Sequence, residues 1–430
     1  MRAAFFTLGC KVNQYETSVM TQRFAAEGFD IVDPDDEADV YVVNSCTVTA
    51  TGDKKSRQMV RRFRRQNPTA VVCLCGCFPQ AFPDAAEQIP EADVIMGARN
   101  RSALLDAVKQ RLAGGQRVVQ IVPHEKGEAF ETMRAAHMGD KTRAFVKIQD
   151  GCERYCAYCI IPKARGPVRS KPLEEIRAEL EGLAAAGYRE IVYAGINLPS
   201  YGQDIDARLL DAIRVANGID GIQRIRLGSL EPENLPAEDI AAMAAMDKLC
   251  PQFHLSLQSG CDATLRRMRR HYDTAMYRDI CRDLRAAFPH CALTTDIMVG
   301  FPGETEEEHA ASLAFARDIG FAKVHVFAYS RRPGTTAAAM ADQVENSVKV
   351  RRSHEMATCT AETRRAFLDT QIGSTFDVLF EDRENGHWCG YTANYTPVRV
   401  ASDADLSGRI LPVKLTGHDG DTCTGSLAHQ

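Results

Sequence analysis

The chain has 430 residues, 45% of them hydrophobic and 25% charged, with a formal net charge of −5. This length exceeds one ordinary hydrophobic core and predicts two or three domains, and the composition is that of a soluble globular protein. No apolar run approaches membrane-spanning length, and the N-terminal residues turn polar too early for a secretory signal, so a cytoplasmic protein without a membrane partner is expected. The 15 cysteines should then be free thiols or metal ligands rather than disulfides.

The N-terminal part, residues 1–115, alternates short apolar runs with amphipathic stretches. Its expected strands are residues 3–8, 40–43, 70–74 and 93–96, and its expected helices include residues 14–27, 54–66 and 101–112. This alternation predicts an open α/β sheet domain. A segment rich in glycine and charge, residues 114–143, is expected to act as a linker.

The alternation restarts in the central part, residues 138–368. Its expected strands are residues 144–148, 190–193, 224–227, 253–257, 293–298 and 323–327. Helical stretches lie between them, including residues 173–186, 237–246, 275–287 and 304–318. Six β/α repeats are fewer than the eight that close a full barrel, so we predict an incomplete (β/α)6 barrel.

The tail has a different pattern. After a long polar helix at residues 345–368, residues 371–430 contain short strand candidates separated by Gly and Asp turns. These candidates are residues 376–380, 391–396, 398–400, 410–415 and 423–427. Such a pattern predicts a small C-terminal β-barrel, in a chain whose overall class is α/β.

The motif Cys152-x3-Cys156-x2-Cys159 directly follows the first barrel strand. Three thiolates at this spacing in one loop can ligate three irons of a [4Fe–4S] cluster, which leaves the fourth iron open to an exchangeable ligand. This arrangement is typical of radical S-adenosylmethionine (SAM) enzymes, where SAM is that ligand and its cleavage gives a 5′-deoxyadenosyl radical. A zinc site is the alternative, but zinc normally takes four ligands and closely spaced cysteine pairs.

Bound SAM needs polar groups around its amino acid, ribose and adenine. The segments 194–202, 257–260 and 296–303 follow barrel strands and contain glycines, which allow close approach of the backbone to a ligand. A glycine after a strand is more often only a turn. The candidate SAM-binding residues are Tyr158, Gly195, Asn197, Gln258, Asp296 and Gly300.

A second set of cysteines follows three strands of the N-terminal part. Cys10, Cys46 and Cys77 come after the first, second and third expected strands, whereas Cys73 and Cys75 belong to the third strand itself. In an open parallel sheet the loops at the carboxyl ends of the strands meet at one edge. The three cysteines therefore predict a second three-cysteine [4Fe–4S] site, with buried free thiols as the alternative.

Five motifs stand together between residues 7 and 305. They are Thr7-Leu-Gly-Cys-Lys-Val-Asn-Gln-Tyr-Glu16, Asn44-Ser-Cys-Thr-Val48, Gly76-Cys-Phe-Pro-Gln80, Gly151-Cys152 to Cys159-Ile-Ile-Pro162 with Arg165-Gly166, and Asp296 to Gly300-Phe-Pro-Gly-Glu-Thr305. With them the whole chain resembles the radical SAM methylthiotransferases, which have an N-terminal three-cysteine domain, a radical SAM barrel and a C-terminal TRAM domain. The TRAM resemblance rests on position and strand pattern.

Within that family, the segments 147–151, 164–170 and 195–202 look most like the branch that acts on N6-threonylcarbamoyladenosine in tRNA. The resemblance implies replacement of the C2 hydrogen of that adenine by a methylthio group. One SAM would methylate sulfur held at the N-terminal cluster, and another would supply the radical. The implied partners are the tRNA anticodon loop, an electron donor and a sulfur donor, and the sequence identifies neither donor.

An RNA substrate should leave a basic footprint. Three basic stretches adjoin the expected active-site loops: residues 54–65, the group Lys163, Arg165, Arg169 and Lys171, and residues 266–270. A charge run is more often simply a solvated face. The tail is rich in Asp and Glu, so any RNA contact there would depend on a few cations and on Tyr391, Tyr395 or Trp388.

Two alternative functions stay open at this stage. One is methylthiolation of a ribosomal protein side chain, as in another branch of the family, and the basic stretches disfavour it. The other is a non-catalytic, zinc-stabilised RNA-binding protein. Protein purified without air would be brown with iron–sulfur clusters and colourless with zinc.

Overall fold

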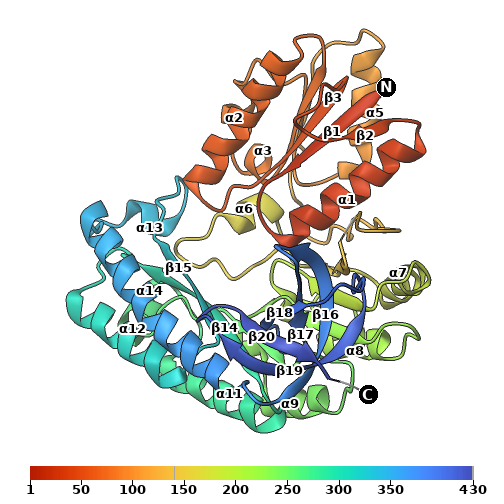
Figure 1. Ribbon diagram of the computed structural model, residues 1–430. Coiled ribbons are helices and arrows are strands. Elements are labelled where there is room, and N and C mark those ends of the chain that lie inside the picture. The colour runs from red at the N-terminus through yellow and green to blue at the C-terminus, as the bar shows by residue number, and fades with distance from the viewer. Residues whose placement is uncertain (140, 429–430) are drawn as a thin grey trace.

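The structure is a computed structural model that describes residues 1–139 and 141–428. Its N-terminal part is a parallel sheet in the order β2-β1-β3-β4-β5-β6 (Figure 1). The strands are β1 (Arg2–Thr7), β2 (Asp30–Val32), β3 (Val40–Ser45), β4 (Val71–Gly76), β5 (Val94–Met96) and β6 (Val118–Gln120). The predicted open α/β sheet is confirmed. Strands β2 and β6 were not predicted, because each is a partly exposed run of three residues at an edge.

Helices cover both faces of this sheet, because β3 and β4 are buried along their whole length. The helices are α1 (Lys11–Ala26), α2 (Ala50–Gln66), α3 (Cys77–Ala81), α4 (Pro83–Glu87) and α5 (Leu104–Leu112), with a 3-10 turn η1 (Arg101–Ala103). Helices α1 and α5 bury their apolar sides in one core, and α2 buries Val60 and Phe63 in the other. The parallel register leaves the loops after β1, β3 and β4 together at one edge.

The central part is the predicted incomplete barrel. Strands β7 (Arg143–Lys147), β10 (Glu190–Ala194) and β11 (Arg224–Leu227) form one parallel sheet, and β12 (Ser229–Leu230), β13 (Gln252–Leu255), β14 (Ala292–Val299) and β15 (Lys323–Ala328) form the next. The Cys250 N–H donates to the Ile225 carbonyl over 2.8 Å, so backbone bonding continues between the two sheets. All six predicted barrel strands are therefore present, with the two-residue β12 in addition.

Helices and short elements surround this barrel. The helices are α7 (Leu173–Ala185), α8 (Leu209–Asn217), α9 (Ala237–Ala244), α10 (Asp262–Arg267), α11 (Thr274–Ala287), α12 (Glu306–Ile319) and α13 (Thr336–Ala339). Next to the cysteine loop lie the short hairpin β8 (Gln149–Asp150) and β9 (Arg169–Ser170) and the helix α6 (Ile161–Arg165). The 3-10 turns are η2 (Leu198–Ser200) and η3 (Pro232–Asn234). On the barrel side, the cavity described below is lined mainly by strand residues rather than by these connections.

The tail is a closed five-stranded barrel, as predicted, and follows α14 (Asn346–Asp369). Its strands are β16 (Thr375–Glu384), β17 (His387–Thr392), β18 (Pro397–Ala401), β19 (Ile410–His418) and β20 (Cys423–Leu427). The predicted strand at residues 391–396 is wrong in its second half. There the chain turns, with Tyr395 at a φ of 66° and the Thr392 N–H donating to the Thr396 carbonyl over 3.1 Å.

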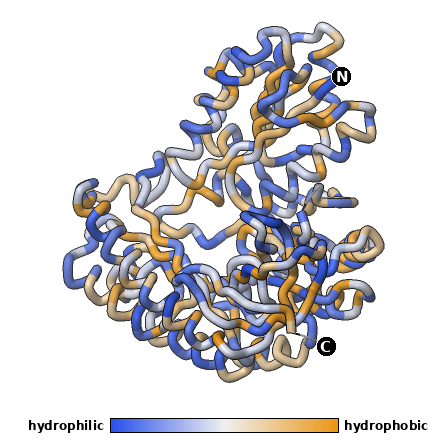
Figure 2. Tube along the Cα trace, viewed as in Figure 1, coloured by the Kyte–Doolittle hydropathy of each residue, from blue (hydrophilic) through white to orange (hydrophobic). Residues whose placement is uncertain are grey.

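The tail barrel lies against the open side of the central barrel (Figure 1). Arg143 at the start of β7 pairs with Glu381 of β16 over 2.7 Å, and Arg224 of β11 donates to the Asp377 carbonyl over 2.6 Å. Apolar residues concentrate in the strands, and polar residues are frequent on the outer helices (Figure 2). No helix in residues 1–139 and 141–428 combines the length and the apolar composition needed to cross a membrane.

Candidate active site

The structure brings Cys10, Cys46 and Cys77 to one edge of the N-terminal sheet. Cys10 precedes α1, Cys46 follows β3, and Cys77 begins α3 directly after β4. The Cys10 and Cys46 loops touch: a Cβ atom built on Gly9, whose φ is 107°, would lie 2.9 Å from the Cys46 Cβ. Only glycine fits this position, since a side chain there would push the two loops apart.

Two of these thiols, the half-buried Cys46 and the buried Cys77, lie side by side, which favours a bound cationic group. Burial, followed by the neighbouring Cys77, raises the pKa of Cys46 to about 12, and burial also raises the pKa of Cys77. Buried thiols close together disfavour ionisation unless a bound cation compensates for the charge. The donor set of this edge therefore fits a metal cluster that binds thiolates. Cys73 and Cys75 are buried within β4, as predicted.

Cys152, Cys156 and Cys159 share one loop between β8 and α6. The Cys159 N–H donates to the Cys156 carbonyl over 3.0 Å, which folds the loop into a tight turn. Burial raises the pKa of Cys152 to about 11 and that of Cys159 to about 12, and the adjacent Cys156 acts in the same direction on both. This loop therefore has the same thiol-rich, desolvated character as the N-terminal edge.

Two donors point at the sulfur atoms of this loop. Arg270 Nη1 lies 3.2 Å from Cys156 Sγ, and Asn197 Nδ2 lies 3.8 Å from Cys152 Sγ. Hydrogen bonds to cluster sulfurs are one of the means by which proteins tune an iron–sulfur centre. The Arg270 side chain is buried and pairs with Glu231, so its position is fixed.

Two predicted SAM-binding residues have buried acceptors without partners. Among the described residues, nothing donates to Asn197 Oδ1 or to Gln258 Oε1. Gln258 also has a φ of 68°, an unusual conformation for a residue other than glycine, and its N–H donates to the Asp296 carbonyl over 2.8 Å. Buried acceptors are normally satisfied, so these two fit a ligand that carries N–H or O–H groups, as SAM does.

The other four candidates have different surroundings. Tyr158 is packed edge-on against Phe301, and its hydroxyl accepts from Arg270 over 3.4 Å. Gly300 is buried, and a Cβ there would lie 2.4 Å from Lys349 Cγ, so a close approach of α14 explains this glycine. Gly195 and Asp296 line the cavity described next.

A cavity of about 810 Å³ opens between the three parts of the chain. The N-terminal part contributes Gly9, Cys10 and Lys11 to its lining. The barrel contributes residues that include Gly195, Arg226, His254, Asp296 and His325, and the tail contributes Tyr391, Asn394 and Tyr395. One of the N-terminal cysteines thus faces the barrel interior.

Lys11 stands next to Cys10 on the wall of this cavity. Its side chain is exposed to the cavity. Partial desolvation of the ammonium by the protein groups around the cavity, followed by the charges of Arg226 and Arg143, lowers the pKa of Lys11 to about 8.

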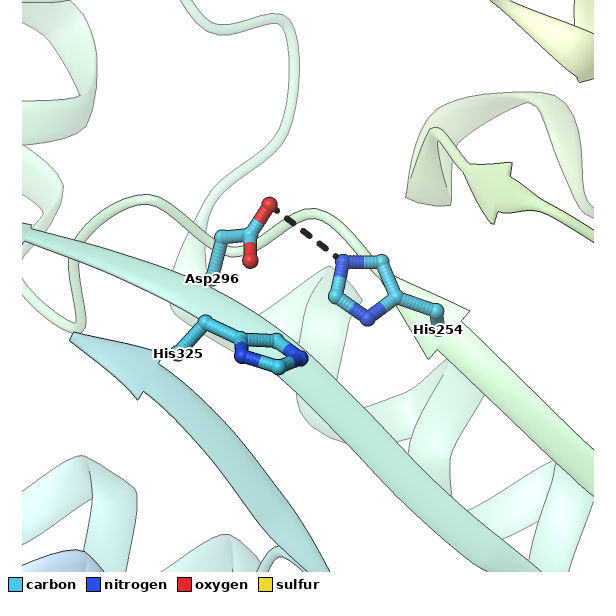
Figure 3. A group of neighbouring side chains, drawn as sticks. All are labelled: His254, Asp296 and His325. Atoms are coloured by element: carbon cyan, nitrogen blue, oxygen red, sulfur yellow. Dashed lines mark ion pairs between the residues drawn. The ribbon is translucent and has the colours of Figure 1, made fainter. Parts of the chain in front are cut away.

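His254 and His325 are cavity residues that the sequence analysis missed. With Asp296 they form a group whose side-chain ligand atoms lie within 4.8 Å of one another, and the His254 imidazole lies 3.4 Å from the Asp296 carboxylate (Figure 3). His254 lies on β13 and His325 on β15. Polar side chains at alternating positions were the available signal, Gln252 and His254 on β13 and Lys323 and His325 on β15, because alternate residues of such strands face the interior.

A buried ion network joins the N-terminal sheet to the barrel. Arg165 of α6 donates to Asn13 Oδ1 and to Glu16 Oε1, each over 2.6 Å, and its Nε lies 3.2 Å from Cys77 Sγ. On the barrel side, Arg165 lies 3.2 Å from the Asp150 carboxylate. Burial would raise the pKa of Glu16, but the surrounding cations hold that pKa well below its usual range.

The prediction that the group after the cysteine loop faces RNA is wrong for three of its four members. Arg165, Arg169 and Lys171 are buried. Arg165 belongs to the network just described, and Lys171 pairs with the buried Glu179. Only Lys163 of the four is not buried, and its ammonium lies over the Phe82 ring at 5.1 Å.

The other two basic stretches are also partly neutralised. On α2, Arg61 lies 3.3 Å from Glu91, Arg62 pairs with Asp35, and Arg64 pairs with Asp93. In the stretch at residues 266–270, Arg267 pairs with Glu308 and Arg270 with Glu231. Lys54 and Lys55, near the start of α2, are exposed and have no acidic partner among the described residues.

Comparisons with known proteins agree with this site. Residues 2–97 match the uncharacterized protein family UPF0004, and residues 146–316 match the Radical SAM superfamily. The radical SAM methyltransferase TsrM from Kitasatospora setae has a similar fold, with a TM-score of 0.57 and 15% identity over 78% of this chain and 74% of that chain. The fold and the site therefore define a radical SAM enzyme.

Full-length relatives narrow the class. The threonylcarbamoyladenosine tRNA methylthiotransferase MtaB of Bacillus subtilis is 38% identical over 96% of this chain and 93% of its own length. A tRNA-2-methylthio-N(6)-dimethylallyladenosine synthase of Pelotomaculum thermopropionicum is 34% identical over 98% and 96%. The chain belongs to the radical SAM methylthiotransferase family, whose cofactors are SAM and an iron–sulfur cluster.

Iron content tests whether the two cysteine sites are independent. The triple variant Cys152→Ala, Cys156→Ala, Cys159→Ala should keep about half of the iron of the reconstituted wild type, because the N-terminal site would still hold a cluster. Iron and sulfide are measured after anaerobic reconstitution. The matched control Cys281→Ala, in the barrel core, should keep all the iron. If the triple variant loses all of its iron, or keeps all of it, the chain does not hold two separate clusters.

Proposed function

We propose that this enzyme transfers a methylthio group to C2 of N6-threonylcarbamoyladenosine beside the anticodon of tRNA, in the cytoplasm. Cys152, Cys156 and Cys159 would hold the [4Fe–4S] cluster that binds SAM. Cys10, Cys46 and Cys77 would hold a second [4Fe–4S] cluster that carries the sulfur. When bound, these cofactors supply the radical that removes the C2 hydrogen and the methylthio group that replaces it.

One observation carries this proposal: Cys10 of the N-terminal site lines the same cavity as Gly195 and Asp296 of the barrel. Methylthiolation needs a hydrogen-abstracting group and a sulfur-bearing group to reach one carbon atom. An adenine in this cavity would lie between Cys10 and the candidate SAM-binding residues Gly195 and Asp296. Aligned reacting groups contribute a large part of catalysis by proximity, so a shared cavity is the arrangement that this reaction requires.

The chain's own residues would position the cofactors. Asn197 and Gln258 offer their unpartnered carbonyl oxygens to the donor groups of SAM. Arg270 and Asn197 donate toward sulfur atoms of the barrel cysteines. The Arg165 network fixes the N-terminal cysteine loops above the barrel, and the tail residues Tyr391 and Tyr395 close the far end of the cavity.

We infer the RNA-facing surface from the cations of α2 that have no acidic partner among the described residues. The anticodon loop is single-stranded, so a base can leave its stack and enter a pocket at modest cost. Helix α2 starts close to the barrel mouth, where the Ala50 N–H donates to Ser330 Oγ over 3.3 Å. Lys54 and Lys55 stand one turn further along and are the cations of this helix best placed to hold phosphates.

The choice of nucleoside is the first test of this function. Relatives named for threonylcarbamoyladenosine and for dimethylallyladenosine are similarly close, at 38% and 34% identity. The reconstituted enzyme should methylthiolate tRNA that carries threonylcarbamoyladenosine and leave matched tRNA with dimethylallyladenosine largely unmodified. Nucleoside mass spectrometry measures both products. Efficient turnover of the dimethylallyl substrate would refute the substrate but spare the family, and transfer to ribosomal protein alone would refute the RNA substrate.

Substitution on α2 tests the RNA surface. The double variant Lys54→Gln, Lys55→Gln should bind substrate tRNA more weakly. The slope of log K against log salt should become shallower by about one to two, because binding releases fewer counterions when fewer phosphates are neutralised. The matched double variant Arg61→Gln, Arg62→Gln should change both quantities less, since Glu91 and Asp35 already neutralise those side chains. Affinity is measured over a range of salt concentrations. A larger effect in the arginine variant would place the RNA on the other end of the helix.

A further inference from the structure

The protein beside the cavity, where Arg226 lines it, contains an excess of cations. Three arginines of the barrel, Arg143, Arg224 and Arg226, surround the single buried carboxylate of Glu190, at 4.0, 3.5 and 3.0 Å. Within residues 1–139 and 141–428, Arg143 alone of the three has a second acidic partner, Glu381. Buried charges are normally paired, so an excess of positive charge beside a cavity favours an anionic ligand.

Arg226 offers a free donor in this region. Its Nε donates to Glu190 over 3.0 Å, and its Nη1 donates to the Ala393 carbonyl over 3.0 Å. These bonds and the Tyr395 ring, 4.5 Å from the guanidinium, fix the plane of the side chain. Among the described residues its buried Nη2 has no hydrogen-bond partner, although Arg226 lines the cavity. An unsatisfied buried donor is costly, so a ligand acceptor or a water molecule that reaches Nη2 would be stabilised there.

Lys11 provides a second cation on the facing wall. It lines the same cavity from the N-terminal part, its side chain is exposed there, and it forms no ion pair within the described part of the chain. Asp296 is the one carboxylate among the described residues that line the cavity, and it pairs with His254 instead. An anion in the cavity would therefore be attracted to the side of Lys11 and Arg226 and repelled by Asp296.

We propose that Lys11 and Arg226 form a carboxylate-binding site, and that it takes the threonine carboxylate of the substrate nucleoside. This inference rests on the proposed function. The threonylcarbamoyl group hangs from N6 of the adenine whose C2 reacts, and it ends in a carboxylate. With the adenine near Cys10, the substituent can extend toward Arg226 within the same cavity.

This site accounts for discrimination between the two nucleosides of the family. A guanidinium with a free N–H and an ammonium bind a carboxylate through charge-assisted hydrogen bonds. A dimethylallyl group would leave Arg226 Nη2 without an acceptor and would offer no counter-charge to the Lys11 ammonium. Sites built to bind a polar group reject analogues that lack it more strongly than apolar pockets reject an added methyl, because the buried polar groups lose their partners.

The test compares two anticodon stem-loops that differ in one functional group. One carries threonylcarbamoyladenosine, and the other carries the same nucleoside with the threonine carboxylate converted to a carboxamide. Binding to the enzyme with both clusters reconstituted is measured by fluorescence anisotropy. The wild type should bind the carboxylate at least about tenfold more tightly, as expected for a hydrogen bond to a charged group.

Variants assign that preference to the two residues. Lys11→Gln and Arg226→Gln should each lose most of the preference, whereas Lys11→Arg should retain it because the positive charge remains. The exposed Arg282→Gln on α11 is the matched control and should behave as the wild type. Because Arg226 also contacts the tail, Lys11→Gln and Lys11→Arg form the primary comparison, with iron content measured to show that the adjacent cluster is intact.

The outcomes separate this site from the proposed function. Equal binding of carboxylate and carboxamide by the wild type, with methylthio product formed on the carboxylate RNA, would overturn the site and leave the function standing. A preference that survives in both Lys11→Gln and Arg226→Gln would also overturn the site. If the wild-type enzyme neither binds nor modifies either of the two RNAs, both the function and the site are refuted.

Discussion

Arg165 reaches from helix α6 of the barrel into the N-terminal part and meets Asn13, Glu16 and Cys77 there. The same guanidinium contacts Asp150 on the barrel side. It thus joins the loops of both cysteine sites, because Cys77 belongs to one site and α6 directly follows the loop that carries the other. This contact therefore helps to fix the relative position of the two sites.

The energetics of this network explain why it fixes a position. Removing several charges from water is costly, and only close, well-directed pairing compensates for the cost. Glu16 is fully buried and meets Arg101 at 3.0 Å, Lys147 at 2.7 Å and Arg165 at 2.6 Å. Loss of one partner from a buried pair typically costs about 3–5 kcal/mol. A sliding apolar interface would tolerate several orientations of the sheet on the barrel, whereas these charges tolerate one.

That orientation determines which residues of each part of the chain line the cavity. The N-terminal edge brings Cys10 and Lys11 to the cavity, the barrel brings its polar strand residues, and the tail closes it with Tyr391 and Tyr395. No single part of the chain contains a complete site. The reaction needs a radical at one carbon atom and sulfur delivered to that same atom. A cavity lined by separate parts of the chain allows a different part to supply each of these groups.

Much of the fold and of the cysteine pattern could be predicted from the sequence, because these features are local. Cys152, Cys156 and Cys159 are close in the chain, and strand-end positions imply convergence of Cys10, Cys46 and Cys77 without knowledge of any pairing. Edge strands β2 and β6 were too short to show a pattern.

Features that depend on contacts between distant segments could not be predicted. A run of arginines looks the same whether it faces solvent or, like Arg165 and Arg169, is buried against acids far away in the chain. His254 and His325 lie on strands 71 residues apart in numbering, 325 − 254, and only the barrel brings them together. The free donor of Arg226 became visible only once its three partners were placed.

The most direct test is the ratio of 5′-deoxyadenosine to methylthiolated nucleoside formed by Arg165→Gln, with the exposed Arg282→Gln as control. If Arg165 holds the two cysteine sites in their relative position, the variant should retain the barrel iron and cleave SAM, but form at least about tenfold less methylthio product per 5′-deoxyadenosine, as misplacement of reacting groups by about 1 Å suffices for such a loss. An unchanged ratio in the folded variant would contradict the account.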